Sequence, residues 1–559
     1  MLENYLPRES FTSYEDFKAN YRLNIPADFN FAYDVIDEWA KQDPGKPALV
    51  RVDDFDAEER LTFHDLMERS MQAANYYKSL GVKKGDFVLL ILRQRVEAWV
   101  CMLALHRIGA IVIPATFQLM PHDIEYRCNK AGVKVITCVD DPELLASIAQ
   151  VRAQCSALEH VTVVGNHIPV PGGCNDFREE VAAFPPEFPR PQGAESTDVN
   201  DLMLGYFTSG TTGMPKLIVH NYSYPLGHIT TAHYWHQVED GGLHFVSADS
   251  GWAKFGWGKI YGQWICGAVI VAYDTEGKFD PHHMLETIQR LRPTTFCAPP
   301  TVYRFLIKED LSKYDLSSLK KCTIAGEPLN PEVFNKFKAA TGLELTEGFG
   351  QSETTVIIAN FPWFPIKPGS TGKFSPLYDL DIVDENGNSC EDGIVGTIVV
   401  KNLDRQRPAG LLVEYYQDKA ANDAAFFNNL YSTGDTAWRD SDGYIWFVGR
   451  NDDVIKCSGY RIGPFEVESA LMTHPSVLEC AVTAAPDPVR GQVVKATVVL
   501  AKGYAASDAL KKELQNHVKK ETAPYKYPRI IEFVDELPKT ISGKIKRKQI
   551  RMDDHAKQQ

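Results

Sequence analysis

A run of small residues that ends on a lysine is the first stretch of this sequence that could do chemistry. From Tyr206 to Lys216 the chain reads YFTSGTTGMPK. Glycines let backbone N–H groups converge, hydroxyls add donors and the lysine adds a positive charge, so the segment could hold a polyphosphate. It differs from the common phosphate loop G-x-x-x-x-G-K-[ST], because Pro215 precedes the lysine and Leu217 follows it. A polar surface loop is the alternative interpretation.

Three further stretches carry isolated charges among hydroxyls and glycines. EGFGQSETT contains Glu353, a carboxylate that could bind the Mg²⁺ ion of ATP or could be only a helix-start acid. YSTGD places Asp435 after a glycine, where it could accept both ribose hydroxyls, although such turns are common; Arg450 follows in the same stretch. LPKTISGKIKRKQIR presents Lys544, in what could also be a solvated basic tail.

Composition limits the functions that these residues could serve. The chain has 559 residues, 44% hydrophobic and 24% charged, which is a globular composition long enough for several domains. Its net charge of −14 argues against nucleic acid or an anionic membrane surface as the main partner. The 11 cysteines include no C-x-x-C pair, and the first residues lack an apolar signal core. These features predict a cytoplasmic protein with reduced thiols and no membrane span.

The elements that position the charged stretches alternate between helix and strand patterns from Leu61 onward. Helical patterns over 63–80 and 96–108 end at glycines, and the apolar runs FVLLIL and AIVIPA follow them. The same rhythm returns in VKVITCVD, HVTVVG, AVIVAYD and TTFCAPP. Continuous β-branched runs between helices indicate parallel sheets covered on both faces, and therefore an α/β architecture.

The pattern changes after about Gly369. The segment DLDIVDENGNSCEDGIVGTIVV alternates polar and apolar residues around a turn at 385–388, as antiparallel hairpins do. The acidic run NDDVIKCSGY then precedes a new α/β pattern. We therefore predict an N-terminal domain over 1–451 and a small C-terminal domain over 452–559, with the boundary at Asp452.

Together, the four stretches resemble the adenylate-forming acyl-CoA synthetase superfamily of AMP-binding enzymes. The resemblance runs from about Leu61 to Arg551 and is closest to acetyl-CoA and medium-chain acyl-CoA synthetases, through ADSGWAKFGWG, AGEPLNPE and GRNDDVIKCSGYRIGPFEVE. It implies a large N-terminal domain of two parallel-type α/β sheets plus a distorted β-barrel, and a small, mobile α+β C-terminal domain.

The resemblance also implies which residues bind ATP. One loop would clasp the β- and γ-phosphates, two segments would flank the adenine, and the remaining residues would contact the ribose and the α-phosphate. The nucleotide-binding positions are Thr208, Ser209, Gly210, Thr211, Thr212, Gly213, Lys216, Gly326, Glu327, Pro328, Glu347, Gly348, Phe349, Gly350, Gln351, Ser352, Asp435, Arg450 and Lys544. Glu353 matches the magnesium-binding acid, and the catalytic candidates are Lys544, Glu353 and Thr208.

The implied reaction activates a carboxylic acid with ATP and then passes the acyl group to coenzyme A. Attack of the carboxylate on the α-phosphate crowds negative charge, which Mg²⁺ at Glu353 and the Lys544 ammonium would neutralise. The family then rotates its C-terminal domain about a hinge, here Asp452, which would remove Lys544 before the thiol attacks. The positions that match the coenzyme A segment are Ser458, Gly459 and Tyr460.

The acyl pocket is where the sequence departs from its acetate-specific relatives. Those relatives have a tryptophan where Gly350 stands, so this chain should admit a medium-chain, branched or aromatic acid. The alternative is that a neighbouring aromatic residue, Trp257 or Trp252, refills the space. The positions that match the acyl pocket are Trp252, Ala253, Gly256, Ala325 and Gly350.

Other functions stay open at this point. A stand-alone ligase could load its acyl group onto a carrier protein, the motifs also occur in luciferase-like oxygenases, and a catalytically silent protein could use the fold as a nucleotide sensor. The expected partners are a small carboxylic acid, ATP and coenzyme A, with no nucleic acid. A homodimer is left open, as is acetylation of Lys544, which would remove its charge.

Overall fold

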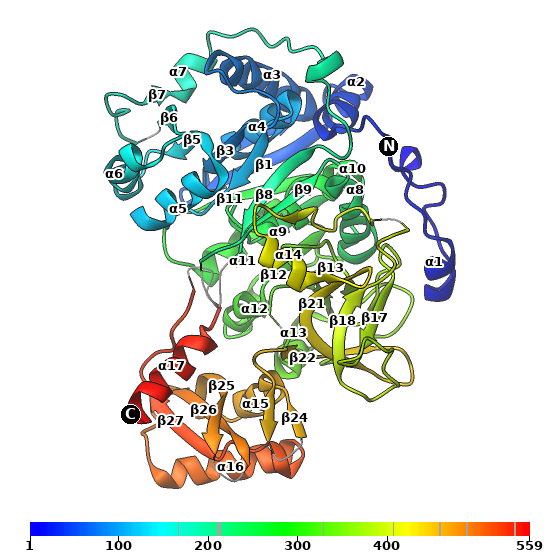
Figure 1. The fold of residues 1–559 in the computed structure, drawn as a ribbon, viewed down its shortest axis with the longest axis vertical. Helices are drawn as coiled ribbons and strands as arrows, with labels where there is room; N and C mark the ends of the chain where they lie inside the picture. Colours follow the sequence, from blue (N-terminus) through cyan, green and yellow to red (C-terminus); the bar gives the residue numbers. More distant parts are fainter. Residues whose placement is uncertain are drawn as a thin grey trace.

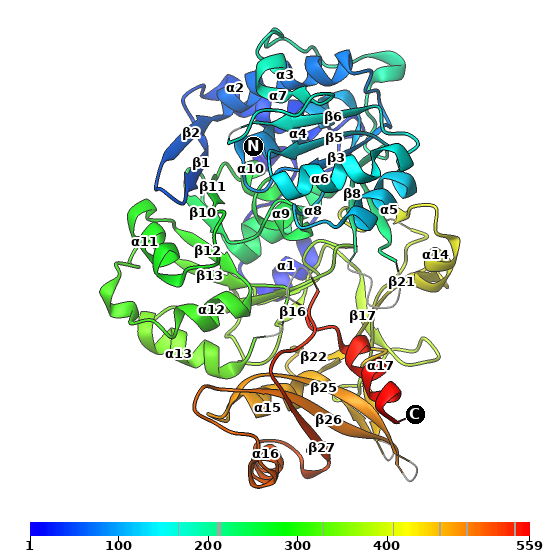
Figure 2. The ribbon, with the colours of Figure 1, turned by 90° about the vertical axis from the view of Figure 1, so that its left-hand side faces the viewer.

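The computed structural model describes residues 1–165, 167–208, 214–327, 329–405, 407–457, 460–487, 490–540 and 544–558. These residues form four β-sheets with helices packed around them (Figures 1 and 2). The first three sheets use strands up to Arg450, and the fourth begins at Ile455. In Figure 1 the fourth sheet and its helices form the orange-to-red lobe at the bottom.

The first sheet has eight strands in the order β19-β9-β8-β4-β3-β5-β6-β7. Its strands from β8 to β7 pair in parallel, whereas β9 and β19 pair antiparallel. The strands are β3 (Phe87–Ile91), β4 (Ile111–Pro114), β5 (Val133–Val139), β6 (His160–Val164), β7 (Asn175–Asp176), β8 (Leu202–Phe207), β9 (Leu217–Asn221) and β19 (Glu414–Tyr415). Every residue of β3 is buried, which explains its continuous apolar sequence.

Helices pack around the first sheet with the boundaries that the sequence predicts. Helix α3 (Phe63–Ser79) starts with a capping box between Thr62 and Asp65, and α4 (Val96–Ile108) ends at Gly109, whose φ is 83°. The other helices of the first 200 residues are α1 (Tyr14–Asn20), α2 (Glu38–Gln42), α5 (Pro121–Ala131), α6 (Pro142–Val151) and α7 (Phe177–Val181).

The second sheet has nine strands in the order β16-β15-β14-β13-β12-β10-β11-β1-β2, with parallel pairing from β14 to β1. Its strands are β1 (Pro47–Asp53), β2 (Glu58–Thr62), β10 (Leu243–Val246), β11 (Val269–Asp274), β12 (Thr295–Ala298), β13 (Lys321–Ile324), β14 (Leu345–Phe349), β15 (Ile358–Ala359) and β16 (Lys373–Phe374). The helices between them are α8 (Tyr224–Ile229), α9 (Ala253–Gly258), α10 (Tyr261–Ile265), α11 (Pro281–Leu291), α12 (Pro300–Leu306) and α13 (Pro331–Thr341).

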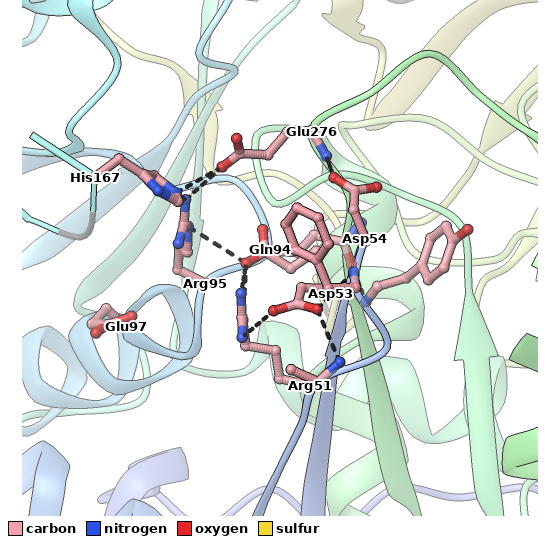
Figure 3. A network of polar contacts seen from close by, with 12 residues as sticks. Arg51, Asp53, Asp54, Gln94, Arg95, Glu97, His167 and Glu276 are labelled. Atoms are coloured by element: carbon pink, nitrogen blue, oxygen red, sulfur yellow. Dashed lines mark hydrogen bonds and ion pairs between the residues drawn. The ribbon is translucent and has the colours of Figure 1, made fainter. Parts of the chain in front are cut away.

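A polar network ties the two large sheets together (Figure 3). Asp274, at the end of β11, accepts a 2.7 Å hydrogen bond from Arg51 of β1 and lies 3.4 Å from Arg95, which directly precedes α4. Arg95 also donates to Glu276 at 2.6 Å, and His167 lies 3.3 Å from the same carboxylate. Arg95 is buried, so these bonds compensate its lost hydration while they fix one sheet against the other.

The third and fourth sheets are smaller and mainly antiparallel. The third has the order β17-β18-β21-β20 with β22 on β21, and no pairing among the described residues closes it into the distorted barrel of the family. Its members are β17 (Leu380–Val383), β18 (Gly396–Val400), β20 (Phe426–Phe427), β21 (Leu430–Arg439), β22 (Ile445–Arg450) and the nearby helix α14 (Lys419–Ala425). The fourth sheet and its helices are β23 (Ile455–Cys457), β24 (Tyr460–Ile462), β25 (Val477–Asp487), β26 (Gly491–Leu500), β27 (Ile530–Val534), α15 (Pro464–Met472), α16 (Asp508–Glu521) and α17 (Arg547–Gln558).

The α/β prediction is confirmed, and a small α+β unit follows the large one as expected. The domain boundary at Asp452 stays a prediction, as does the mobility of the C-terminal domain. None of the described helices combines the length and the apolar character that crossing a membrane would need.

Candidate active site

The predicted adenine-flanking segments follow two neighbouring parallel strands. Strands β13 and β14 pair in register from Cys322 with Leu345 to Ile324 with Glu347. Ala325, Gly326 and Glu327 follow the first strand, and Gly350 and Gln351 follow the second. Because the carboxyl ends of parallel strands meet at one edge, the two segments lie side by side. Pro328 falls outside the described residues.

The predicted phosphate loop joins two antiparallel strands, β8 and β9. Thr208 donates its N–H to the Lys216 carbonyl oxygen at 2.9 Å, and Lys216 returns a 3.2 Å bond to the Thr208 hydroxyl. These bonds close the base of the loop. The predicted positions Ser209, Gly210, Thr211, Thr212 and Gly213 fall outside the described residues.

Tyr415, which the sequence analysis missed, links the base of this loop to Glu353. The Lys216 ammonium lies 4.9 Å from the centre of the Tyr415 ring, and the Tyr415 hydroxyl donates to Glu353 Oε1 at 2.9 Å. Burial raises the pKa of Glu353 above its usual value, while the Tyr415 bond and the charges of Arg450 and Lys544 oppose that shift. No local pattern marks Tyr415, because β19 is two residues long and reaches β9 from almost two hundred residues away.

Asp435 and Arg450 are cross-strand neighbours on β21 and β22. Gln351 donates from Nε2 to Asp435 Oδ2 at 2.5 Å, so this predicted adenine-side residue orients the predicted ribose acid. Burial raises the pKa of Asp435 to about 6, although Arg450 and Lys544 act in the opposite direction. Arg450 passes over Gly434, whose φ is 70° and where a Cβ would lie 3.1 Å from the guanidinium.

Lys544 lies close enough to these acids for its charge to lower the pKa of both Glu353 and Asp435. Its backbone N–H donates to the Thr540 hydroxyl at 3.1 Å, and its side chain is exposed. The five charged positions predicted from the sequence are therefore near one another, although they are spread over more than three hundred residues of the chain: Lys216, Glu353, Asp435, Arg450 and Lys544.

Glu347 and Gly348 have packing contacts in addition to their predicted contact with the nucleotide. Burial raises the pKa of Glu347 to about 8, and its carboxyl group accepts a 3.3 Å bond from the Leu329 N–H and a 3.2 Å bond from the Thr371 hydroxyl. A Cβ on Gly348 would collide with the indole ring of Trp235. Glu347 therefore anchors the segment that follows Gly326, Gly348 packs on Trp235, and the direct contact of both with ATP stays a prediction.

The space next to Gly350 is filled by Trp257, as the alternative interpretation of the acyl pocket supposes. A Cβ on Gly350 would lie 2.7 Å from Trp257 Cζ2. Trp257 is buried on α9, the helix that starts at Ala253 after Trp252 and includes Gly256. The indole therefore lies where the predicted acyl pocket would have a wall, but it comes from a different element from the tryptophan of acetate-specific relatives.

Lys254 is a charged residue that the sequence analysis passed over. Burial lowers its pKa, Glu327 opposes this effect, and Lys544 adds to it, so all three side chains share one region. Its ammonium lies directly over the Gly326 backbone, where a side chain would collide with it. The only available signal was a lysine inside the otherwise apolar run WAKFGWG.

The predicted coenzyme A segment is only partly described. Ser458 and Gly459 fall outside the described residues, and the Tyr460 backbone pairs with Cys457 in the β23–β24 hairpin. At the predicted hinge, Asp452 Oδ1 lies 3.9 Å from Arg450 Nε, and Asp453 accepts a 2.5 Å bond from Arg551 of α17. The roles of these residues stay predictions.

Two family models match the chain. The AMP-binding enzyme model covers residues 36–403, and the model of the AMP-binding enzyme C-terminal domain covers residues 466–544. Acyl-coenzyme A synthetase ACSM3, mitochondrial, of Rattus norvegicus is 42% identical over 552 residues, which are 97% of this chain and 93% of the relative.

Solved structures of similar proteins share the fold over nearly the full length. The anthranilate CoA ligase AuaEII, solved in complex with anthranoyl-AMP, is 30% identical with a TM-score of 0.86 over 96% of this chain and 99% of its own. A benzoate CoA ligase from Burkholderia xenovorans LB400 is 27% identical with a TM-score of 0.80 over 94% of this chain and 100% of its own.

Proposed function

The chain belongs to the AMP-binding enzyme family and is an ATP-dependent, AMP-forming acyl-CoA ligase; from this premise we propose which residues carry out its two half-reactions. The observation that supports the assignment is the convergence of Lys216, Glu353, Asp435 and Lys544 on one region. These positions match the residues that bind phosphates, Mg²⁺, ribose and the reacting carboxylate in the family.

In the first half-reaction, a carboxylate oxygen of the acid attacks the α-phosphorus of ATP, and the bond to pyrophosphate breaks. The Lys544 ammonium is attracted to both reacting anions, so it positions them and offsets the charge that accumulates at phosphorus. Thr208 and Lys216 hold the departing phosphates at the base of the loop. Asp435 and Arg450 hold the ribose, with Gln351 fixing the carboxylate of Asp435. No general base is needed, because the acid is already ionised at neutral pH.

Glu353 would hold Mg²⁺ together with the phosphates of ATP. The donors fit, because Mg²⁺ prefers hard oxygen ligands and usually takes only one or two protein carboxylates when it travels with a nucleotide. The described residues contain no group of three or more His, Cys, Asp or Glu side chains suited to a metal held by protein alone. When bound, the ion supplies positive charge to the triphosphate.

In the second half-reaction, the sulfur of coenzyme A attacks the carbonyl carbon of the acyl-adenylate, the bond to the phosphate oxygen breaks, and AMP leaves. We assign the approach of coenzyme A to Ser458, Gly459 and Tyr460. Lys544 must leave the site beforehand. In the family, this happens when the C-terminal domain rotates about a hinge that matches Asp452.

The substrate is an acid other than acetate, and we propose a medium-chain, branched or aromatic acid. At position 350 this chain has a glycine, where acetate-specific relatives have a tryptophan. The indole that packs against Gly350 is that of Trp257, which lies on α9 beside Gly256. The similar structures named above include ligases of anthranilate and benzoate, both of them aromatic acids.

The proposal is tested by acid-dependent exchange of labelled pyrophosphate into ATP, followed by detection of AMP and the coenzyme A thioester. We expect both activities, with the highest kcat/KM for an acid larger than acetate in a series from acetate to decanoate plus benzoate.

Trp257→Ala should shift the optimum to longer acids. Each methylene that the enlarged pocket accepts should raise kcat/KM by at most about fourfold, or ~0.8 kcal/mol. Trp438→Ala, which removes a tryptophan stacked on Trp446 in the third sheet, is the matched control.

Two outcomes would contradict this assignment. Exchange without a thioester would identify a ligase that loads a carrier protein, and the absence of both activities would identify a silent nucleotide-binding protein. An optimum at acetate would contradict the proposed substrate class alone.

Three further expectations stay proposals. We place the protein in the cytoplasm, although the rat relative is named as mitochondrial. We also propose a homodimer, and acetylation of the exposed Lys544, which would remove the charge needed for the first half-reaction.

A further inference from the structure

Four buried polar side chains lie behind Trp257 and form what we call the Tyr–His cluster: Tyr206 on β8, His220 on β9, and Tyr224 and His228 on α8. Each is at most 3% exposed. The rings of His220 and Tyr224 lie 4.1 Å apart, and those of Tyr224 and His228 lie 4.6 Å apart. Three separate elements therefore bring these side chains to one place.

Each member of the Tyr–His cluster carries a polar atom with no hydrogen-bond partner of ordinary geometry in the part of the chain that the structure describes. These atoms are Tyr206 Oη, His220 Nδ1, Tyr224 Oη and His228 Nε2. The Tyr206 and Tyr224 hydroxyls lie close enough to affect each other's pKa, but not in the geometry of an ordinary hydrogen bond. Native proteins pair nearly all of their buried polar groups, because an unpaired group loses its hydration without compensation. Four such atoms in one cluster indicate a polar partner that binds among them.

The Tyr–His cluster adjoins the predicted acyl pocket. A Cβ on Gly256 would lie 2.6 Å from the Tyr206 hydroxyl and 3.4 Å from the Tyr224 hydroxyl, so both hydroxyls point at a predicted acyl-pocket residue. The His228 ring lies 6.1 Å from the ring of Trp257, which is the residue that packs on Gly350. An acyl chain that passes the predicted pocket residues would therefore end at the cluster.

The hydrogen-bonding groups of the Tyr–His cluster are uncharged. Burial lowers the pKa of His220 to about 4, lowers the pKa of His228 well below its usual value, and raises the pKa of both tyrosines. His220 Nε2 lies 2.8 Å from the Ser352 carbonyl oxygen, which can only accept, so Nε2 carries the proton and Nδ1 is an acceptor. The tyrosine hydroxyls can donate, so the cluster contains hydrogen-bond donors as well as an acceptor.

We propose that the Tyr–His cluster is the far end of the acyl pocket and binds an uncharged hydroxyl or carbonyl group carried by the substrate acid opposite its carboxylate. This inference rests on the proposed function, because it assigns a ligand group to the pocket of that same reaction. It narrows the substrate from any larger acid to a hydroxy or oxo acid of one particular length.

The test compares straight-chain acids from butanoate to octanoate with the same acids carrying a terminal hydroxyl, using the complete enzyme with ATP and coenzyme A. At one chain length we expect the hydroxy acid to have a kcat/KM about tenfold above that of its plain partner, which is the net contribution of one hydrogen bond between neutral groups. Tyr224→Phe should lower this ratio about tenfold, and Tyr206→Phe is the second variant in case the first does not fold.

Tyr77→Phe is the matched control. Tyr77 is also fully buried, but its hydroxyl already pairs with Thr137 at 2.7 Å, in the layer formed by α3 and β5. This variant should leave the ratio unchanged. A ratio near one at every chain length, or a ratio that survives both cluster variants, would overturn the inference and leave only buried water in the cluster. Failure of every acid to give a thioester would instead overturn the proposed function itself.

Discussion

Burial and the neighbouring cations shift the pKa of Asp435 in opposite directions. Burial raises the pKa to about 6, and Arg450 and Lys544 only partly reverse that shift. Below about pH 6 the carboxyl group of the free enzyme therefore holds a proton, and it can no longer accept both ribose hydroxyls. Above that pH the acceptor is restored.

We therefore predict that kcat/KM for ATP falls as the pH drops below about 6, since this parameter reports the ionisation of the free enzyme. Asp435→Asn should lower kcat/KM for ATP about 10–100-fold at pH 7.5, as expected for losing a hydrogen bond to a charged group. The variant should also lose the limb of the pH profile near pH 6. A limb that persists in Asp435→Asn would assign it to ATP or to another residue.

Site residues could be predicted where the residue type itself carries the chemistry, and their roles stay predictions. Glu353, Asp435 and Lys544 are charged residues among glycines and hydroxyl-bearing residues, and such positions can be recognised from the sequence alone. Tyr415 escapes that approach, because its partner Glu353 lies far away in the sequence. Trp257 could be named only as one of two alternatives, because its partner Gly350 is also remote from it in the sequence. An aromatic residue also has many reasons to be buried, so its type alone does not identify a site.

At the scale of elements, helix α15 and strand β22 form a contact between the two predicted domains. Gly463, at the start of α15, packs on Val448 of β22, and a Cβ there would lie 2.5 Å from the Val448 carbonyl oxygen. The φ of Gly463 is −75°, so alanine would be strained only by that contact and not by its backbone. Lys544 is close to Glu353 in this same arrangement of the domains.

Gly463→Ala should therefore disfavour the arrangement that places Lys544 in the site. Overpacking of this kind costs about 1–3 kcal/mol, which corresponds to a fall of about 5–150-fold in pyrophosphate exchange. Thioester formation from a supplied acyl-adenylate should change much less. Gly172→Ala is the matched control, because no atom lies within 4 Å of its Cβ position. Equal loss of both steps would show that the contact persists in both arrangements.

The elements themselves could be predicted well, since periodicity and caps are local. Helix α4 ends at Gly109, and strand β3 coincides with an uninterrupted apolar run. The antiparallel pairing of β19 with β9 could not be predicted, because nothing in a two-residue strand specifies a partner. The polar network around Arg95 was hidden for the same reason, as its members come from four separate segments.

Across the two predicted domains, one lysine has to act in the first half-reaction and be absent from the second. Lys544 follows the fourth sheet, whereas Glu353 and Asp435 belong to the part of the chain before Asp452. The sequence could suggest this alternation only through the family resemblance, because composition and periodicity carry no information about how two domains move.

The most direct measurement is therefore the effect of Lys544→Ala on each half-reaction separately, with Lys546→Ala, an exposed lysine of the same segment, as the control. We predict that Lys544→Ala lowers acid-dependent pyrophosphate exchange by about 10²–10³-fold or more, as expected for removing a preorganised charge at the reacting centre. It should still convert a supplied acyl-adenylate and coenzyme A to the thioester at close to the wild-type rate. Equal loss of both half-reactions, or exchange at the wild-type rate, would contradict the account.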